Sequence, residues 1–180
     1  MDSASGGLRV KTIYLLRHAK SSWDDASLPD FHRPLAPRGR KAAPRVGDYM
    51  ARHGLLPDRV LCSAARRAVE TWQALSSVLG DHAAVEFRED IYHATPGDLL
   101  DAVRSLPPEV ESVLLIGHNP TFEDLALALA GSGEEKALQE LDRKYPTGAM
   151  AILDFPVQDW GEVREGTGWL RAFVRPRDLK

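Results

Sequence analysis

The sequence holds a single cysteine, Cys62, so an internal disulfide and any zinc site built from several cysteines are excluded. Its longest uninterrupted apolar run is six residues, 125–130, whereas a membrane-spanning helix needs about 20. The N-terminal letters MDSASGG include an acid and no apolar stretch, unlike a secretory signal. We therefore expect a cytoplasmic protein that does not enter a membrane, and we expect Cys62 to be a small buried residue rather than a nucleophile.

Neither positive nor negative charge dominates the chain. It has 23 Lys and Arg and 26 Asp and Glu residues, which gives a net charge of −3. This balance argues against a nucleic-acid partner. The distribution is uneven, since residues 1–67 carry a net +7 and residues 68–180 a net −10. Such an asymmetry is typical of a protein that meets an anionic ligand with its first third, although solvated faces also differ by chance.

The length and composition predict one globular domain. The chain has 180 residues, of which 43% are hydrophobic and 27% charged, and these values match those of an ordinary soluble domain. We expect a flexible N-terminus over residues 1–9, followed by a single domain over residues 10–180.

Short apolar runs alternate with helical patterns along the chain, which favours a β-α-β plan. The runs at 11–16 and 112–116 are apolar at nearly every position, as expected for strands covered on both faces. We predict an α/β fold, a three-layer sandwich around a mostly parallel, mixed central sheet. The expected strands are 11–16, 59–62, 84–87, 112–116, 149–155 and 169–175, and the expected helices are 38–53, 64–79, 96–105 and 120–130. The last helix is opened by Asn119, Pro120 and Thr121, with Asp124 three residues on, in a capping arrangement.

Polar residues come directly after three of the expected strands. Arg17 and His18 follow the first strand, Arg66 and Arg67 follow the second, and His118 follows the fourth. In open α/β sheets, ligands bind outside the carboxyl ends of the parallel strands, so we expect two histidines and two arginines to meet at one edge. Guanidinium groups match phosphoryl oxygens in geometry and charge, and histidine can act as a covalent nucleophile. The sequence therefore predicts a phosphoryl-transfer site.

Three sequence blocks carry a family resemblance. The stretch LLRHAK at 15–20 is similar to the RHG-type signature of the histidine phosphatase (phosphoglycerate mutase-like) superfamily, with Ala19 where glycine is commoner. The block CSAARRAVET at 62–71 resembles the second block of that family, and LIGHNP at 115–120 resembles the block with the second histidine. The RHAKSSW opening and the GHNP form are most similar to the SixA-like phosphohistidine phosphatase branch. Over residues 10–131 the resemblance implies a phosphoglycerate mutase-like fold.

The resemblance also implies roles for the matched residues. His18 would be the nucleophile that accepts the phosphoryl group, while Arg17, Arg67 and His118 would hold its oxygens and stabilise the transition state. The match puts the family arginine at Arg67 and not at Arg66. Neighbouring residues on a helix lie about 100° apart, so these two arginines cannot both face one pocket in the same way.

Other polar neighbours are further candidates. Lys20 and Asn119 lie beside the motifs and are predicted to contact substrate, with a solvated lysine as the plain alternative for Lys20. Other branches of the family place a glutamate as general acid after a later strand. Glu89 is the nearest candidate here, unless it is simply a solvated charge. The resemblance implies no metal and no cofactor.

A missing general acid favours a substrate whose leaving group needs little protonation. An alkoxide needs a proton, whereas the conjugate acid of imidazole has a pKa near ~6.5, so transfer between two imidazoles is close to thermoneutral. This argument agrees with the SixA-like resemblance, which implies a metal-independent phosphatase that acts on phosphohistidine in a protein partner. We also expect a monomer. The alternatives are a small-molecule phosphomonoesterase of the same superfamily and a non-catalytic phosphate-binding module.

Overall fold

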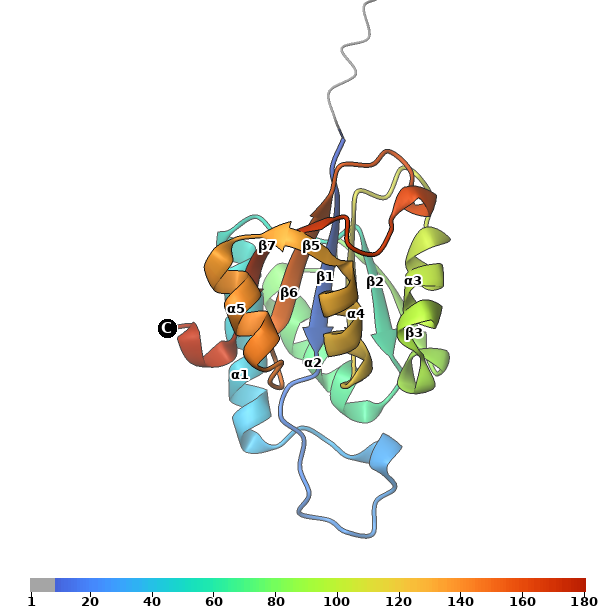
Figure 1. Cartoon of the computed structure of the whole chain (residues 1–180). Helices are drawn as coiled ribbons and strands as arrows, with labels where there is room; N and C mark the ends of the chain where they lie inside the picture. The colour runs from blue at the N-terminus through green and yellow to red at the C-terminus, as the bar shows by residue number, and fades with distance from the viewer. Residues whose placement is uncertain (1–8) are drawn as a thin grey trace, which may run out of the picture.

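The computed structural model describes residues 9–180, so the expected flexible segment 1–9 lies outside the described residues apart from Arg9. A seven-stranded sheet with the order β3-β2-β4-β1-β6-β7-β5 forms the centre of the molecule (Figure 1). The strands are β1 (Lys11–Arg17), β2 (Arg59–Ser63), β3 (Ala84–Arg88), β4 (Ser112–Gly117), β5 (Ala130–Gly133), β6 (Met150–Phe155) and β7 (Gly168–Val174).

The sheet is mixed, and its parallel part carries the sequence motifs. Strands β3, β2, β4 and β1 pair in parallel, β6 pairs antiparallel with β1 and β7, and β5 pairs in parallel with β7. In this register Arg17 lies opposite Gly117, and Cys62 lies opposite Ile116. The three motif-bearing strands therefore end side by side, and β1 and β2 point to the lower edge in Figure 1.

Helices cover both faces of the sheet. Ile13 and Leu15 of β1 belong to one buried cluster, and Tyr14 and Leu16, on the alternate positions, belong to a second one. This alternation explains why the run at 11–16 is apolar at both odd and even positions. The first cluster takes in α3 (Pro96–Arg104), α4 (Thr121–Leu129) and α5 (Glu135–Arg143), and the second takes in α1 (Pro37–Arg52) and α2 (Arg66–Leu79) (Figure 1). The expected three-layer α/β sandwich is confirmed.

All of the expected strands and helices are present, with ends shifted by at most two residues, but β5 and α5 are missing from the sequence prediction. β5 has the sequence AGSG, whose glycines have low strand propensity. α5 buries only Ala137 and Leu141 in its nine residues, which is too short a stripe to recognise. The predicted cap of α4 is wrong, because Pro120 takes the N-cap position and no side chain caps the helix.

A glycine at the start of α1 fixes the path of the chain that leaves β1. A Cβ on Gly39 would lie 2.1 Å from the carbonyl oxygen of Lys20, and that oxygen already accepts a hydrogen bond from the amide of Ala36. Only glycine allows this close approach. The contact holds the beginning and the end of the loop between β1 and α1 together, beside the site described below.

Across residues 9–180, the longest helices fall short of the length and apolar character that crossing a membrane requires.

Candidate active site

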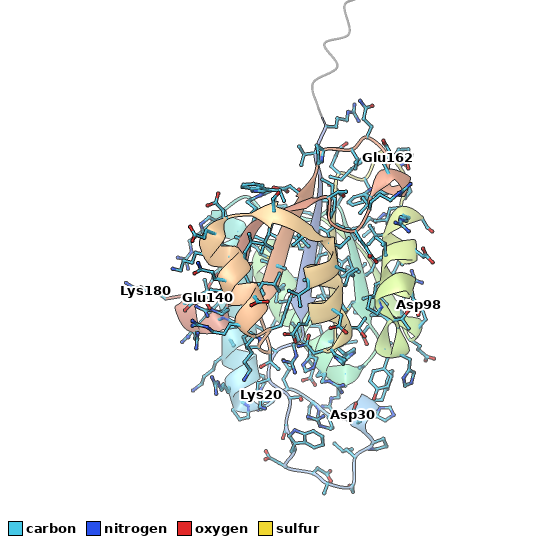
Figure 2. All side chains as sticks on the ribbon, in the orientation of Figure 1. Lys20, Asp30, Asp98, Glu140, Glu162 and Lys180 are labelled. Atoms are coloured by element: carbon cyan, nitrogen blue, oxygen red, sulfur yellow. The ribbon has the colours of Figure 1, made fainter. Side chains whose placement is uncertain are left out.

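The residues expected to bind a phosphoryl group gather at the carboxyl ends of β1, β2 and β4. His18 follows β1, Arg67 lies in the first turn of α2, and His118 follows β4. The ring centroids of His18 and His118 are 5.2 Å apart. Figure 2 shows Lys20 and Asp30 at the same lower end of the molecule.

The backbone around His18 is held on both sides. The amide of His18 donates to the carbonyl of Gly117, and its own carbonyl accepts from the amide of Gly148. The amide of Ala19 donates to the hydroxyl of Thr71 in α2, at 3.0 Å. The first two sequence blocks are therefore joined directly, and this contact sets the position of α2 relative to β1.

His18 has one defined tautomer. Its Nδ1 lies 2.7 Å from the carbonyl oxygen of Ala19, which can only accept, so Nδ1 carries the hydrogen. Its Nε2 accepts a hydrogen bond from Nε of Arg67, at 3.2 Å. Burial lowers the pKa of His18 to about 3, and the positive charges of Arg67 and Arg17 act in the same direction. His18 is therefore neutral, with the lone pair of Nε2 directed into the site.

His118 has the complementary arrangement. Its Nδ1 is 3.3 Å from Nη2 of Arg67, which can only donate, so this nitrogen is the acceptor. Its Nε2 then donates to the hydroxyl of Ser63 at the end of β2, at 2.8 Å. Burial, followed by the charge of Arg67, lowers the pKa of His118 to about 4. Both imidazoles are thus neutral in the ligand-free protein.

Arg67 joins the two histidines, and Asp30 holds it from the opposite side. Nη1 of Arg67 donates to the backbone carbonyl of Asp30 at 2.7 Å, and Nη2 donates to its carboxylate at 3.0 Å. The Nε–H and the second Nη2–H therefore point toward the histidines. We call this pair of donors the Arg67 fork. Arg66 turns outward instead and pairs with Glu70 at 2.8 Å, with 54% of its side chain exposed.

The sequence analysis missed Asp30, although it lies in the site. Besides Arg67, its carboxylate accepts from Nη1 of Arg33 at 2.7 Å and from the hydroxyl of Tyr92 at 2.5 Å. The hydrogen bonds from Tyr92, Arg33 and Arg67 hold the pKa of Asp30 well below its usual range, so it is ionised. Asp30 belongs to a three-residue 3-10 segment in the loop, where no periodic pattern marks a residue as inward-facing.

Arg17 lies beside the histidines and has an unused donor. Its Nη1 donates to the carbonyl of Tyr145 at 2.8 Å, whereas its buried Nε has no hydrogen-bond partner among residues 9–180. Burial lowers the pKa of Arg17, and the nearby carboxylate of Glu123 opposes that shift. A phosphoryl oxygen would satisfy the unpaired Nε–H.

Both amide hydrogens of Asn119 are used within the protein. Its Nδ2 donates to Glu123 at 2.9 Å and to the carbonyl of Tyr145 at 3.2 Å, which uses both amide hydrogens. The remaining Oδ1 is an acceptor and would repel a phosphate. These two hydrogen bonds tie Asn119 to α4 and to the loop at Tyr145, and its contact with substrate stays a prediction.

Two other candidates lie at the rim. Lys20 is exposed and lines a cavity of about 100 Å³ with Arg38 and Thr147, so its contact with substrate stays a prediction. Glu89 is exposed, and among the described residues its carboxylate makes no hydrogen bond to the histidines or arginines of the site. Cys62 is fully buried, and burial raises the pKa of its thiol, which does not suit a nucleophile.

Within the described part of the chain, no three His, Cys, Asp or Glu side chains lie close enough together to hold a metal ion. Independence from metal stays a prediction that needs a direct test.

Comparison with known proteins identifies the family. Residues 13–102, half of the chain, match the profile of the histidine phosphatase superfamily (branch 1). This chain belongs to the histidine phosphatase superfamily. An uncharacterized protein of Mycobacterium tuberculosis is 35% identical over 164 residues, covering 90% of this chain and all of the relative.

Solved structures place this histidine phosphatase in the SixA-like branch. A protein of Agrobacterium tumefaciens assigned as the phosphohistidine phosphatase SixA is 31% identical, with a TM-score of 0.78 over 92% of this chain and 98% of the other. A protein of Nakamurella multipartitia with the same assignment is 26% identical, with a TM-score of 0.77 over 93% and 96%. The expected phosphoglycerate mutase-like fold of this histidine phosphatase is confirmed.

Proposed function

We propose that this protein hydrolyses phosphohistidine on a protein partner, through a covalent phosphohistidine intermediate on His18. The observation that carries the proposal is the pair of contacts that the two ring nitrogens of His18 make. Its Nδ1 donates to the Ala19 carbonyl, so the unprotonated Nε2 is the nitrogen that meets Arg67 beside His118. A neutral imidazole with an oriented lone pair is a competent nucleophile at neutral pH.

In the first step, Nε2 of His18 attacks the phosphorus in line with the leaving nitrogen. A P–N bond forms to His18, and the P–N bond to the substrate ring breaks. When the second nitrogen of the substrate ring is protonated, the ring leaves as neutral imidazole. His18 becomes a phosphorylated imidazolium whose Nδ1–H stays bound to the Ala19 carbonyl.

The Arg67 fork stabilises the negative charge of the phosphoryl oxygens during this step. Its Nε–H and Nη2–H would turn from the two histidines to two phosphoryl oxygens, while Asp30 continues to hold the opposite side. The Nε–H of Arg17, which is unpaired among residues 9–180, would supply a further donor. An arriving dianion raises the pKa of His118, so that Nδ1 can take up a proton and donate to the third oxygen.

In the second step, a water molecule attacks the phosphorus of the intermediate from the side that the substrate ring has left. The bond between phosphorus and Nε2 breaks, and His18 returns to its neutral form. Both protons of the water remain on the product, which leaves as dihydrogen phosphate. No external base is needed for this balance.

The lack of a protonated carboxyl group that could serve the leaving oxygen supports phosphohistidine over an ordinary phosphoester. The carboxyl group bonded to Arg67 is Asp30, whose pKa lies well below its usual range, so it has no proton to give at neutral pH. Glu89 is exposed at the surface. A sugar alkoxide would leave unprotonated and slowly, whereas imidazole leaves readily.

The test is to trap the intermediate and to compare substrates. Incubation with a ³²P-labelled phosphohistidine protein and an alkaline quench should leave label on His18 that acid releases. The variant His18→Asn should lose the label and the turnover, while Arg66→Ala should keep both. A strong preference for sugar phosphates would move the activity to small phosphomonoesters, and a failure to label or turn over any of these substrates would indicate a phosphate-binding module.

A further inference from the structure

A row of aromatic rings leads from His118 to the surface. Tyr92 lies in a 3-10 segment, η2 (Asp90–His93), and its ring meets that of His118 at 5.3 Å and 89°. Phe31, in the opposing segment η1 (Asp30–His32), meets Tyr92 edge-on at 5.0 Å and 88°. Both rings are partly exposed, so they form one wall at the mouth of the site.

The direction of the reaction places the leaving group beside this wall. His18 is only 7% exposed and lies at the bottom of the site, at the end of β1. An in-line attack by its Nε2 directs the leaving group away from His18, toward the mouth. The ring of Tyr92 borders this path, because it faces His118 and its centroid lies 5.8 Å from the guanidinium carbon of Arg67.

We propose that Tyr92 and Phe31 form a leaving-group subsite that binds a flat nitrogen heterocycle, the ring that carries the phosphoryl group. This inference rests on the proposed function, and it states which part of the substrate the aromatic wall would recognise: the ring that leaves. Aromatic rings attract a neighbouring ring through edge-to-face or offset contact, and an alkyl phosphate offers no such partner. The subsite therefore selects among phosphoryl donors by the shape of the group that departs.

Tyr92 also has a second contact that must be separated from this role. Its hydroxyl donates to Asp30, which in turn holds Arg67. Tyr92→Phe removes the hydroxyl and keeps the ring, whereas Tyr92→Leu removes both. If Tyr92 acts only through Asp30 and Arg67, both variants should therefore lose activity in the same way. If the ring itself binds the leaving group, only Tyr92→Leu should change the preference among substrates.

The substrates for the test share a P–N bond and differ in the ring. A phosphohistidine peptide carries the imidazole, and phosphoramidate carries only an amino group. The measured quantity is the ratio of kcat/KM for the peptide to kcat/KM for phosphoramidate. Tyr92→Leu and Phe31→Leu should each lower this ratio about tenfold, while Tyr92→Phe should leave it unchanged.

Trp169 supplies a matched control, because it is an exposed aromatic residue on β7, a strand that does not border the site. Trp169→Leu should leave the ratio unchanged. If Tyr92→Leu does not fold, as judged by circular dichroism, Phe31→Leu carries the test. An unchanged ratio in a folded Leu variant would overturn the subsite alone, whereas wild-type protein that hydrolyses neither substrate would overturn the proposed function with it.

Discussion

The guanidinium of Arg67 is bonded to both the carboxylate and the backbone carbonyl of Asp30, a residue 37 positions earlier in the chain. This pair fixes the edge of Arg67 that faces the histidines. We predict that Asp30→Ala lowers kcat/KM on the order of 100-fold, because a misaligned fork no longer meets the phosphoryl oxygens. Asp30→Asn should recover part of the loss, since its amide oxygen still accepts. Steady-state kinetics and a thermal melt distinguish misalignment from unfolding.

Arg67 and its neighbour Arg66 form a matched pair for mutation. Arg67→Ala removes both donors of the fork and should lower kcat on the order of 100- to 1000-fold. Arg66→Ala removes an exposed ion pair with Glu70 and should change kcat less than about twofold. Equal losses in the two variants would contradict the assignment of the fork to Arg67.

The two buried histidines predict a loss of stability in acid. Their folded pKa values, about 3 for His18 and about 4 for His118, lie below the ordinary value of 6.5. The unfolded chain therefore takes up protons first as the pH falls, so the stabilisation is complete above pH 6.5 and is lost on the way to pH 3–4.

Between pH 7.5 and pH 5.5, each ring should lower the free energy of unfolding by about 1 kcal/mol. Urea denaturation at the two pH values measures the loss. The double variant His18→Asn/His118→Asn should lose about 2 kcal/mol less than the wild type over this interval. The same loss in both proteins would show that the rings are not held neutral.

Gly39 predicts a stability effect next to the site. Gly39→Ala places a Cβ 2.1 Å from the Lys20 carbonyl oxygen and should lower the free energy of unfolding by about 2 kcal/mol, because backbone must move. Gly97→Ala in α3 is the control, since the new Cβ would lie 3.7 Å from the Thr95 hydroxyl, an ordinary van der Waals contact. Denaturant midpoints should fall for the first variant and stay level or rise for the second.

In the proposed steps, arginines and imidazoles stabilise the negative charge of the phosphoryl group. Removal of metal ions by a chelator should therefore leave turnover intact. Phosphohistidine hydrolysis should proceed at the same rate with and without EDTA. Activity that is lost with EDTA and restored by Mg²⁺ would contradict these steps. Adding other divalent ions to the EDTA-treated protein would then identify the metal involved.

The sequence was most informative where regular structure sets the position of a side chain. The apolar run before His18 indicated a strand covered on both faces, and the polar residues after it therefore had to lie at a sheet edge. His118 followed from the same rule. The step of about 100° between helical neighbours indicated that Arg66 and Arg67 cannot both face the site, and the family resemblance selected Arg67. The structure directs Arg67 to the histidines and Arg66 to Glu70.

Irregular segments explain what the sequence analysis missed. Asp30 and Tyr92 lie in short 3-10 segments and are 62 positions apart in the chain, so their contact has no local pattern. The two partners of the Asn119 amide, Glu123 and the Tyr145 carbonyl, were not predicted either, because they depend on the packing of α4 and of the loop at Tyr145.

The burial of Cys62 has a practical consequence. A maleimide added to the native protein would find no accessible sulfhydryl, because the single cysteine is enclosed and its thiolate is disfavoured. A cysteine introduced at Trp23, which is 71% exposed, would therefore be the sole attachment point for a fluorophore. Such a label would lie in the loop that carries Asp30 and could report the docking of a phosphorylated partner in real time.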